Sequence, residues 1–459
     1  MRKRVFLLLL AVLLAFPAGA RAAEDAGPAF DGYLLCLREE AAVPLEAMPE
    51  GLEPVAGAEG LFYASALEDA AWFPPEALAY LEPNHIVYLL EAEAEDWNLT
   101  MIGADAARLT GLDGTGARIG VLDSGVYREH EALAGADVLP GWNYVGNNED
   151  TGDTVGHGTF VASILAAAAP GAEVVPLKCF EGRNGTVRDI IPAIRGGVDE
   201  YGCAVLNMSF GLTSDNVFLK QAVEYAAERG VIMAAAAGNA GTETLNYPAA
   251  YEEVIGVGMV DEGKTVSEIS QHNASVEVTA PGQWLWGPDI TAPDAHRTGR
   301  GTSFACPHVA AAAALMCQAV PGLTAEEFRQ ALREGAEDLG EPGYDEYYGY
   351  GLLSLEDMLL ALPLTPVREG DALHVRLLRP GAAEGLRVWA AGYDPGGRML
   401  VCLPLETAAS GGLLAVNGTL PYPSGAEEVR IFFLGEEDFG PAREAEKSEI
   451  FSGLSRWGR

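Results

Sequence analysis

The sequence predicts an α/β fold with a mostly parallel β-sheet flanked by helices, over about residues 97–362. Short apolar segments there alternate along the chain with longer segments of helical pattern, an order typical of parallel sheets. The apolar segments are continuous instead of alternating with polar residues, which indicates strands buried on both faces. Sites in such sheets lie at the carboxyl ends of the strands, so functional residues are expected there.

Length and charge narrow the class of protein. At roughly 150 residues per domain, 459 residues predict two to four domains. The formal net charge of −37 excludes nucleic acid as a partner, because phosphates would be repelled. The six cysteines show no spacing typical of a zinc site, and we expect most of them to be free and buried.

Residues 1–23 have the composition of a secretory signal peptide. A positive start at 1–4 precedes an apolar run at 5–16, and small residues follow up to Ala22 and Ala23. The apolar run is too short to span a bilayer, and no later segment reaches 18 uninterrupted apolar residues. We therefore expect a secreted protein with no transmembrane segment in the mature chain.

Residues 24–92 form a predicted small α+β unit. Strands are expected at 33–37 and 85–90, and a helix at 74–81, where two prolines suit the first helical turn. The acidic stretch at 91–96 is expected to be a solvated linker to the next domain.

The domain at 97–362 has five expected strands and four expected helices. The strands are expected at 118–122, 172–178, 204–209, 231–237 and 254–260. The helices are expected at 160–169, 187–200 and 217–229, and from Ser303 to at least Met316. Gly230 follows the third helix, as glycine commonly does at a helix C-terminus.

Residues 366–445 are rich in β-forming residues. Expected strands lie at 373–377, 386–391, 399–403 and 429–433, separated by turn-forming groups. This pattern predicts a β-sandwich-like accessory module ending near Pro441 and followed by a charged tail. Its role stays open between substrate or surface binding and stabilisation.

Three polar residues stand where a parallel sheet carries chemistry. Asp123 ends the first strand, His157 lies between two glycines just before a helix, and Ser303 opens the last long helix. An activated serine needs a base within hydrogen-bond reach, and that base needs a carboxylate to fix its tautomer. Asn239, at the end of another strand, supplies an amide donor for a developing oxyanion.

Each of these residues also has a purely structural interpretation. Asp and Asn are common in turns, and Ser is a common helix cap. Taken alone, each is more easily explained that way. Their joint occurrence at strand ends and helix starts favours catalysis.

Five segments resemble the motif set of the subtilisin-like serine proteases, the peptidase S8 family. They are VLDSGV at 121–126, GHGTFVA at 156–162, LNMSFG at 206–211, AAGN at 236–239 and GTSFACPH at 301–308. The order Asp, His, Ser along the chain is that of this family. The resemblance spans about residues 97–360.

The resemblance implies a role for each candidate. Ser303 would be the nucleophile, His157 the general acid and base, Asp123 the orienting carboxylate, and Asn239 an oxyanion donor. Two further sets are similar to the segments that bind extended peptide in this family: Ser209, Phe210 and Gly211, and Ala236, Ala237 and Gly238.

Residues 24–92 are similar to the family's propeptide, which implies a folding aid and intramolecular inhibitor. Self-cleavage is then expected near the bond between Leu90 and Glu91. The residues at 87–90 imply a preference for apolar or aromatic side chains before the scissile bond. Asn246 is expected to place a polar group at the floor of that pocket, which weakens this preference.

Two departures from the family pattern affect function. Phe304 follows the candidate nucleophile where many relatives carry methionine, which removes an oxidation-sensitive group. The segment at 166–172 is short and lacks the loop that helps many relatives bind calcium, so a calcium site is doubtful. No cofactor is predicted.

The sequence thus predicts a secreted serine endopeptidase, made as a zymogen, that acts on protein or peptide substrates. One alternative is a catalytically silent relative that binds peptides or surfaces. The complete set of Asp123, His157, Ser303 and Asn239 argues against it. A second alternative is an esterase that uses the same serine.

Overall fold

The computed structural model describes residues 30–38, 48, 51–55, 61–66, 69, 71–74, 77–85, 96–361, 367–369, 372–380, 386–421, 426–435 and 449–452. The expected signal peptide therefore lies outside the described residues. The chain divides into two compact units, Met1–Glu93 and Ala94–Arg459.

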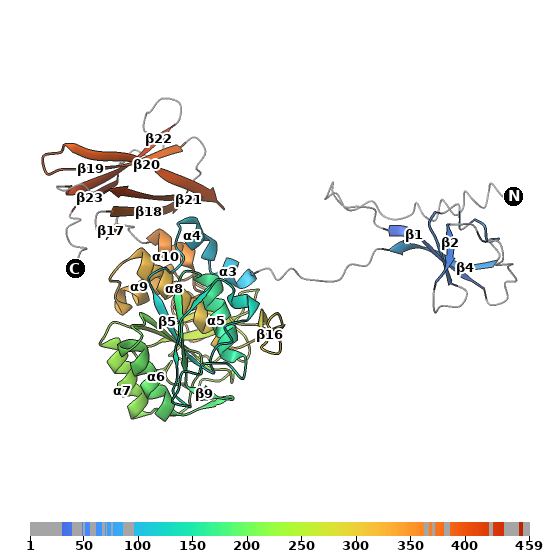
Figure 1. Cartoon of the computed structure of the whole chain (residues 1–459), viewed down its shortest axis with the longest axis horizontal. Helices are drawn as coiled ribbons and strands as arrows, with labels where there is room; N and C mark the ends of the chain where they lie inside the picture. Colours follow the sequence, from blue (N-terminus) through green and yellow to red (C-terminus); the bar gives the residue numbers. More distant parts are fainter. Residues whose placement is uncertain are drawn as a thin grey trace. The chain divides into compact units, whose positions relative to one another are not determined.

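The first unit contains a four-stranded antiparallel sheet (Figure 1). In sheet order its strands are β2 (Leu52–Pro54), β3 (Leu61–Ala64), β1 (Phe30–Leu37) and β4 (Leu78–His85). Leu35, Phe62 and Phe73 are buried together and form the centre of its core. The first unit thus has a small hydrophobic core that is separate from the cores of the second unit.

The helix expected at 74–81 is wrong. Residues from Leu78 onward belong to β4, and Leu81 pairs with Leu35 of β1. Pairing with β1 overrides the helix propensity of Ala and Leu, because tertiary pairing outweighs local propensity, and Pro83 is unsuited to a helix interior. Of the strand expected at 85–90, only His85 is described, and it ends β4.

The second unit is built on a central parallel sheet, as the sequence predicts (Figure 1). In sheet order the strands are β14 (Val278–Pro281), β13 (Ile255–Val260), β12 (Ile232–Ala236), β11 (Val205–Met208), β5 (Arg118–Asp123), β8 (Glu173–Lys178) and β6 (Asp137–Val138), with β7 (Trp142–Asn143) also beside β8. Every neighbouring pair runs parallel. The carboxyl ends of these strands therefore meet at one edge.

Helices cover both faces of this sheet (Figure 1). One face packs on α5 (His157–Ala168) and α8 (Thr302–Ala319), and the other on α6 (Val187–Asp199) and α7 (Val217–Ala227). Consecutive residues of β5 show the alternation. Val121 packs with the α5 and α8 core, whereas Leu122 packs with the α6 and α7 core.

Shorter elements complete this domain. They are α3 (Trp97–Met101), α4 (Ala104–Leu109), η3 (Glu131–Leu133), α9 (Ala325–Gly335), α10 (Leu355–Ala361), and the hairpins β9 (Phe180–Glu181) with β10 (Asn184–Gly185) and β15 (Leu285–Pro288) with β16 (His296–Gly299). The two hairpins were not expected from the sequence, because their strands are too short to show an apolar pattern.

Both helices that carry candidate residues begin earlier than the apolar pattern suggests. Helix α5 begins at His157 instead of Phe160, so the histidine is its first residue. Helix α8 begins at Thr302 after Gly301, whose φ is +149°. Ser303 is therefore the second helical residue and not the cap, which removes the purely structural interpretation of that serine as a cap.

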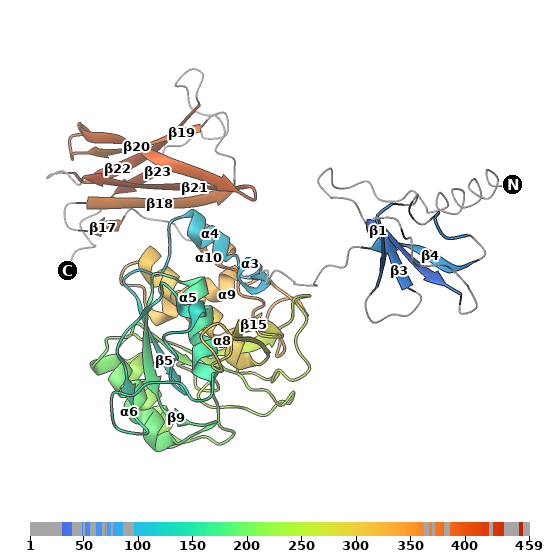
Figure 2. The same cartoon turned by 45° about the vertical axis from the view of Figure 1, so that its right-hand side comes forward.

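In its described residues the C-terminal module contains β-strands and no helix (Figure 2). In sheet order its strands are β17 (Val367–Glu369), β18 (Ala372–Pro380), β21 (Leu413–Pro421), β20 (Met399–Ser410), β19 (Leu386–Tyr393), β22 (Glu428–Gly435) and β23 (Glu449–Ser452). The early residues of β20 pair with β19 and the late residues pair with β21, so one long strand joins two sheet halves. Strand β23 lies in the expected charged tail, where pairing with β22 overrides the polar local sequence.

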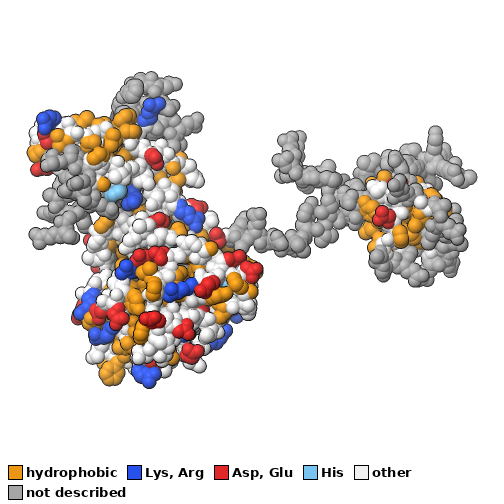
Figure 3. Space-filling model, in the orientation of Figure 1, with side chains coloured by type: hydrophobic (Ala, Val, Ile, Leu, Met, Phe, Trp, Pro, Cys, Tyr) orange, Lys and Arg blue, Asp and Glu red, His pale blue; other side chains and the backbone are white. Residues whose placement is uncertain are grey.

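Two properties concern the described part of the chain as a whole. No helix in it is both long and apolar enough to cross a membrane. All six cysteines are described, and none is in a disulfide. On the face shown in Figure 3, acidic and basic side chains are interspersed over the second unit.

Candidate active site

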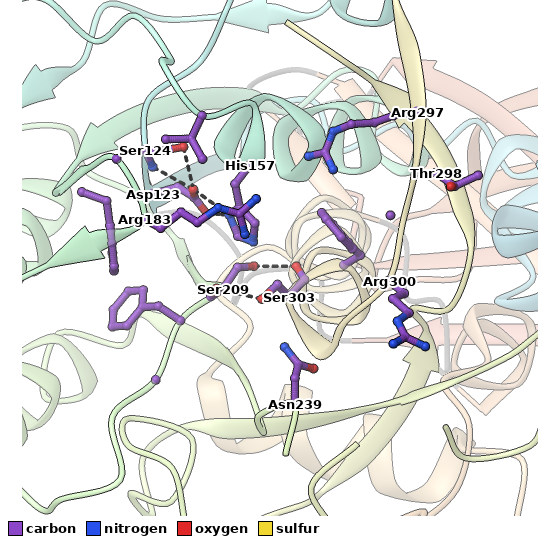
Figure 4. Close-up of a pocket in the computed structure, with 17 residues that line it drawn as sticks. Asp123, Ser124, His157, Arg183, Ser209, Asn239, Arg297, Thr298, Arg300 and Ser303 are labelled. Carbon is purple, nitrogen blue, oxygen red and sulfur yellow. Dashed lines mark hydrogen bonds and ion pairs between the residues drawn. The ribbon is translucent and has the colours of Figure 1, made fainter. Parts of the chain in front are cut away.

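A cleft of about 470 Å³ opens at the carboxyl edge of the central sheet (Figure 4). Asp123, His157, Asn239 and Ser303 all line it. These residues lie far apart in the sequence. Asp123 ends β5 and Asn239 follows β12, whereas His157 and Ser303 lie in the first turns of α5 and α8, which pack on this sheet.

Asp123, which is buried, and His157, which is partly exposed, form a hydrogen-bonded pair. Asp123 is the last residue of β5, and its two carboxylate oxygens lie 2.8 and 2.9 Å from Nδ1 of His157. A carboxylate can only accept, so Nδ1 carries the proton. The other ring nitrogen, Nε2, is thereby left as an acceptor for a proton from the cleft.

Two opposing effects set the pKa of His157. Burial of the ring lowers the pKa, but the charge of Asp123 and its hydrogen bond raise it, so the net pKa lies above the ordinary value. The charge of Asp153 raises it further, and Arg297 lowers it. A raised pKa favours uptake of a proton by the ring, which is the role of a general base.

Asp153 is a residue that the sequence reasoning missed. Its Oδ1 accepts from the backbone N–H of Val155 and Gly156 at 2.9 Å, and its Oδ2 accepts from the N–H and hydroxyl of Thr159 at 2.9 and 2.6 Å. The carboxylate thus satisfies donors on both sides of the start of α5 and fixes the turn that presents His157. An acidic residue three positions before Gly-His-Gly is the sequence signal that marks it.

Ser303 is held by a reciprocal pair of hydrogen bonds. Its Oγ donates to the backbone carbonyl of Ser209 at 3.0 Å, and Oγ of Ser209 donates to the backbone carbonyl of Ser303 at 2.7 Å. The hydroxyl proton therefore points toward the strand segment and not toward His157. The N–H of Ser303 belongs to the first turn of α8, where helical N–H groups have no acceptor within the helix.

Asn239 presents its amide donors to the cleft. Its Oδ1 accepts from the N–H of Thr302 at 2.8 Å and from the Thr302 hydroxyl at 3.1 Å, which fixes the amide orientation. Figure 4 shows the Nδ2 end directed toward Ser303. A Cβ at Gly301 would lie 3.2 Å from that nitrogen, so the glycine leaves room for it.

Of the two segments expected to bind substrate, one lines the cleft and the other does not. Ser209, Phe210 and Gly211 line the cleft. Ala236 and Ala237 are buried behind it. Gly238 is half-buried and is not part of the cleft lining.

Asn246 occupies the space between the two segments. Its Nδ2 donates to the carbonyl of Ala237 at 3.0 Å. A Cβ on Gly238 would lie 2.2 Å from that nitrogen, and a Cβ on Gly211 would lie 3.2 Å from the Cβ of Asn246. The side chain of Asn246 thus narrows the space between the two segments, where the sequence predicts a pocket for an apolar side chain of the substrate.

A second histidine of the domain, His308, lies on α8 and has a structural role. His308 is fully buried, with Nδ1 3.0 Å from the carbonyl of Phe304 and Nε2 2.9 Å from Nδ2 of Asn98. Burial lowers its pKa to about 4, so the ring is neutral at physiological pH. A neutral ring with a proton on Nδ1 satisfies both contacts, and it ties α8 to α3.

The parallel sheet, the Asp–His pair and the serine at a helix start define an α/β serine hydrolase. Residues 114–351 match the model of the subtilase family, and the chain belongs to that family. It is 35% identical to Subtilisin DY of Bacillus licheniformis over 58% of this chain and 98% of the relative. It is 36% identical to Thermitase of Thermoactinomyces vulgaris over 50% of this chain and 85% of the relative.

A solved structure agrees with these relatives. The crystal structure of a lanthipeptide protease superposes with a TM-score of 0.55 at 26% identity, and the match covers 60% of this chain and 97% of that one. The protein is therefore a serine endopeptidase of the subtilase family, with protein or peptide substrates.

Proposed function

We propose that the chain is a secreted serine endopeptidase, made as a zymogen, in which Asp123, His157 and Ser303 form the catalytic triad. The observation that carries the proposal is the Asp123–His157 pair, at 2.8 Å, in the same cleft as a serine at the start of α8. This is the arrangement that activates a hydroxyl for attack on a carbonyl.

The first step transfers the proton of Ser303. The hydroxyl leaves the Ser209 carbonyl by rotation about its Cα–Cβ bond and donates to Nε2 of His157 while Oγ attacks the peptide carbonyl. Asp123 stabilises the imidazolium that forms, because it already accepts from Nδ1. Nδ2 of Asn239 and the N–H of Ser303 stabilise the oxyanion.

The second step releases the products. His157 returns the proton to the leaving amine, and the acyl group stays on Oγ of Ser303. Water then donates a proton to His157 and its oxygen attacks the acyl carbon. The bond between that carbon and Oγ breaks, His157 returns the proton to Oγ, and the new carboxyl group is freed. The backbone at 209–211 lines the cleft and is suited to pair with an extended peptide, giving affinity that depends little on sequence.

Three observations support secretion and a zymogen. Residues 1–23 have the composition of a signal peptide. A similar protein, 34% identical over 56% of this chain, is the minor extracellular protease Epr of Bacillus subtilis. The unit Met1–Glu93 has a sheet and core of its own, which suits an inhibitory propeptide released near Leu90. The mechanism requires no cofactor.

The test uses the full chain and its Ser303→Ala variant. We expect the wild-type protein to hydrolyse casein and to begin, after self-cleavage, between Glu91 and Asp96 by N-terminal sequencing. The variant should lose both activities while keeping the wild-type circular dichroism spectrum. Unchanged casein hydrolysis by the variant would refute the nucleophile, and an active enzyme that begins at Ala23 or Glu24 would refute the zymogen.

A further inference from the structure

The cleft carries a concentration of positive charge that is unusual for this chain. Three arginines line it, Arg183, Arg297 and Arg300, although the whole sequence has 29 basic and 66 acidic residues. Among the described residues that line the cleft, Asp123 is the one carboxylate, and it is bonded to His157. The positive side chains are therefore not balanced within the cleft.

Two of the arginines border one end of the cleft. Arg297 lies on β16 and Arg300 follows it, and Figure 4 shows both on the opposite side of Ser303 from Ser209. In the proposed function the acyl half of the substrate lies along the segment at 209–211. The two arginines on and after β16 consequently border the half of the peptide that leaves as the amine.

Contacts with aromatic rings orient both guanidinium groups. Cζ of Arg297 lies 5.2 Å from the ring centre of Phe160, and its Nη2 donates to the carbonyl of Gly156 at 3.2 Å. Cζ of Arg300 lies 5.0 Å from the ring centre of Trp284. A guanidinium has five N–H donors, so these contacts leave most donors available for a ligand.

Three arginines elsewhere in the domain have acidic partners. Arg118 pairs with Glu173, and both Arg329 and Arg333 pair with Glu277. In the part of the chain that the structure describes, none of the three cleft arginines is within ion-pair distance of a carboxylate. An acidic ligand would supply the partner that the protein itself supplies at the other sites.

The sequence itself contains such a ligand next to the proposed self-cleavage site. Glu91, Glu93, Glu95 and Asp96 follow Leu90 within six residues. On cleavage of the bond after Leu90, this acidic segment would occupy the leaving-group half of the cleft. The charge of the segment is complementary to that of Arg297 and Arg300.

We propose that Arg297 and Arg300 form a subsite for acidic side chains after the scissile bond, so that the protease selects peptides with Glu or Asp at the first positions of the leaving half. This inference rests on the proposed function, because the direction of the substrate follows from it. The acidic segment at 91–96 is then the first substrate of this kind that the enzyme meets.

The test measures the hydrolysis of two fluorogenic peptides by the secreted protein after self-cleavage. Both carry Val-Tyr-Leu-Leu, the residues at 87–90, before the scissile bond, followed by either Glu-Ala-Glu-Ala or Gln-Ala-Gln-Ala. We expect kcat/KM to be about tenfold higher for the Glu peptide, because a solvent-exposed ion pair contributes up to about fivefold and two pairs are formed.

Variants assign the preference to these residues. Arg300→Gln should lower the Glu/Gln ratio to about threefold, Arg300→Lys should retain most of it, and the double variant with Arg297→Gln should bring it close to one. Arg195 is the matched control. It is an exposed arginine over an aromatic ring, Tyr225, away from the cleft, and Arg195→Gln should leave the ratio unchanged.

The ratio separates this inference from the proposed function. A wild-type ratio near one, or a high ratio that survives the double substitution, would overturn the acidic subsite while leaving the protease intact. If neither peptide nor casein is hydrolysed, the proposed function fails. The same peptides are then compared as ligands by fluorescence anisotropy, where tighter binding of the Glu peptide supports the subsite and equal binding rejects it.

Discussion

Two histidines of the subtilase domain lie in opposite environments. His157 lies at the cleft with its side chain 31% exposed and a carboxylate on Nδ1. His308 is fully buried and has a backbone carbonyl in the corresponding place. Burial lowers the pKa of both rings, but only His157 has a charge that outweighs burial. The partner on Nδ1 therefore decides whether a histidine serves chemistry or structure.

The largest effect should come from replacing His157 and His308 by glutamine in two separate variants. His157→Gln removes the base, so kcat/KM for casein-derived peptides should fall by on the order of 10⁴-fold or more, with little change in unfolding temperature. His308→Gln should do the reverse, because it alters the buried contacts with Phe304 and Asn98. Loss of activity in a well-folded His308→Gln variant would break the comparison.

A second prediction removes the charge that distinguishes the two sites. Asp123→Asn leaves the shape of the pair but can hold His157 in the wrong tautomer, so kcat should fall by about 10⁴-fold. The pKa of His157, followed by NMR, should then fall below 6.5, because burial is the largest effect and only the smaller effect of Asp153 still raises the pKa. A pKa that stays high in Asp123→Asn would show that another group controls the ring.

The third prediction concerns stability at acid pH. His308 has a folded pKa of about 4 and an ordinary value of 6.5, so the unfolded state binds the proton more tightly between these values. The free energy of unfolding should therefore fall by about 3 kcal/mol as the pH falls from 6.5 to 4.

Denaturant titrations at several pH values measure this loss. The fall should be smaller in His308→Gln and should persist in His157→Gln. His157 contributes with the opposite sign, because its raised pKa gives stability that is present below pH 6.5 and is lost as the pH rises through the folded pKa. An unfolding free energy independent of His308 between pH 6.5 and 4 would contradict the assignment of a neutral ring.

The smallest expected effect is on the pH at which kcat/KM falls on the acid side of the pH profile. Because the base must be neutral, kcat/KM should fall as the pH falls through the raised pKa of His157. The midpoint of this limb should lie above pH 6.5 in a profile recorded with a neutral peptide substrate. A midpoint below 6.5 would mean that burial outweighs Asp123 in the free enzyme.

The sequence predicted five strands of the central sheet and the residues that meet at its edge, but not β14, β6 and β7. Continuous apolar runs marked these five strands, Asp123 follows one run directly, and Asn239 lies just beyond another. Residues 74–81 were predicted as helix because two prolines precede residues that favour a helix locally, whereas the strand formed from Leu78 onward depends on β1, which is distant in sequence. Strand β23 was missed for the same reason.

Details of the site depended on contacts that no local pattern records. The sequence named Ser303 but not the hydrogen bond from its hydroxyl to the Ser209 carbonyl. The sequence predicted that Asn246 lies near the pocket. That Gly211 and Gly238 leave room for its side chain is evident only from the packing. Asp153 and the cleft arginines were missed because surface-type charges are common and become meaningful only beside Ser303 and His157.

The reciprocal hydrogen bonds between Ser303 and Ser209 have a mechanical consequence. They tie the end of β11 to the start of α8 at the two points where substrate would be gripped and cut. The segment that would pair with the peptide backbone and the attacking oxygen are thus held at a fixed distance from each other. If the segment moves, Ser303 moves with it. Since a misplacement of about 1 Å can cost about 100-fold in rate, this tie makes alignment a property of the resting fold.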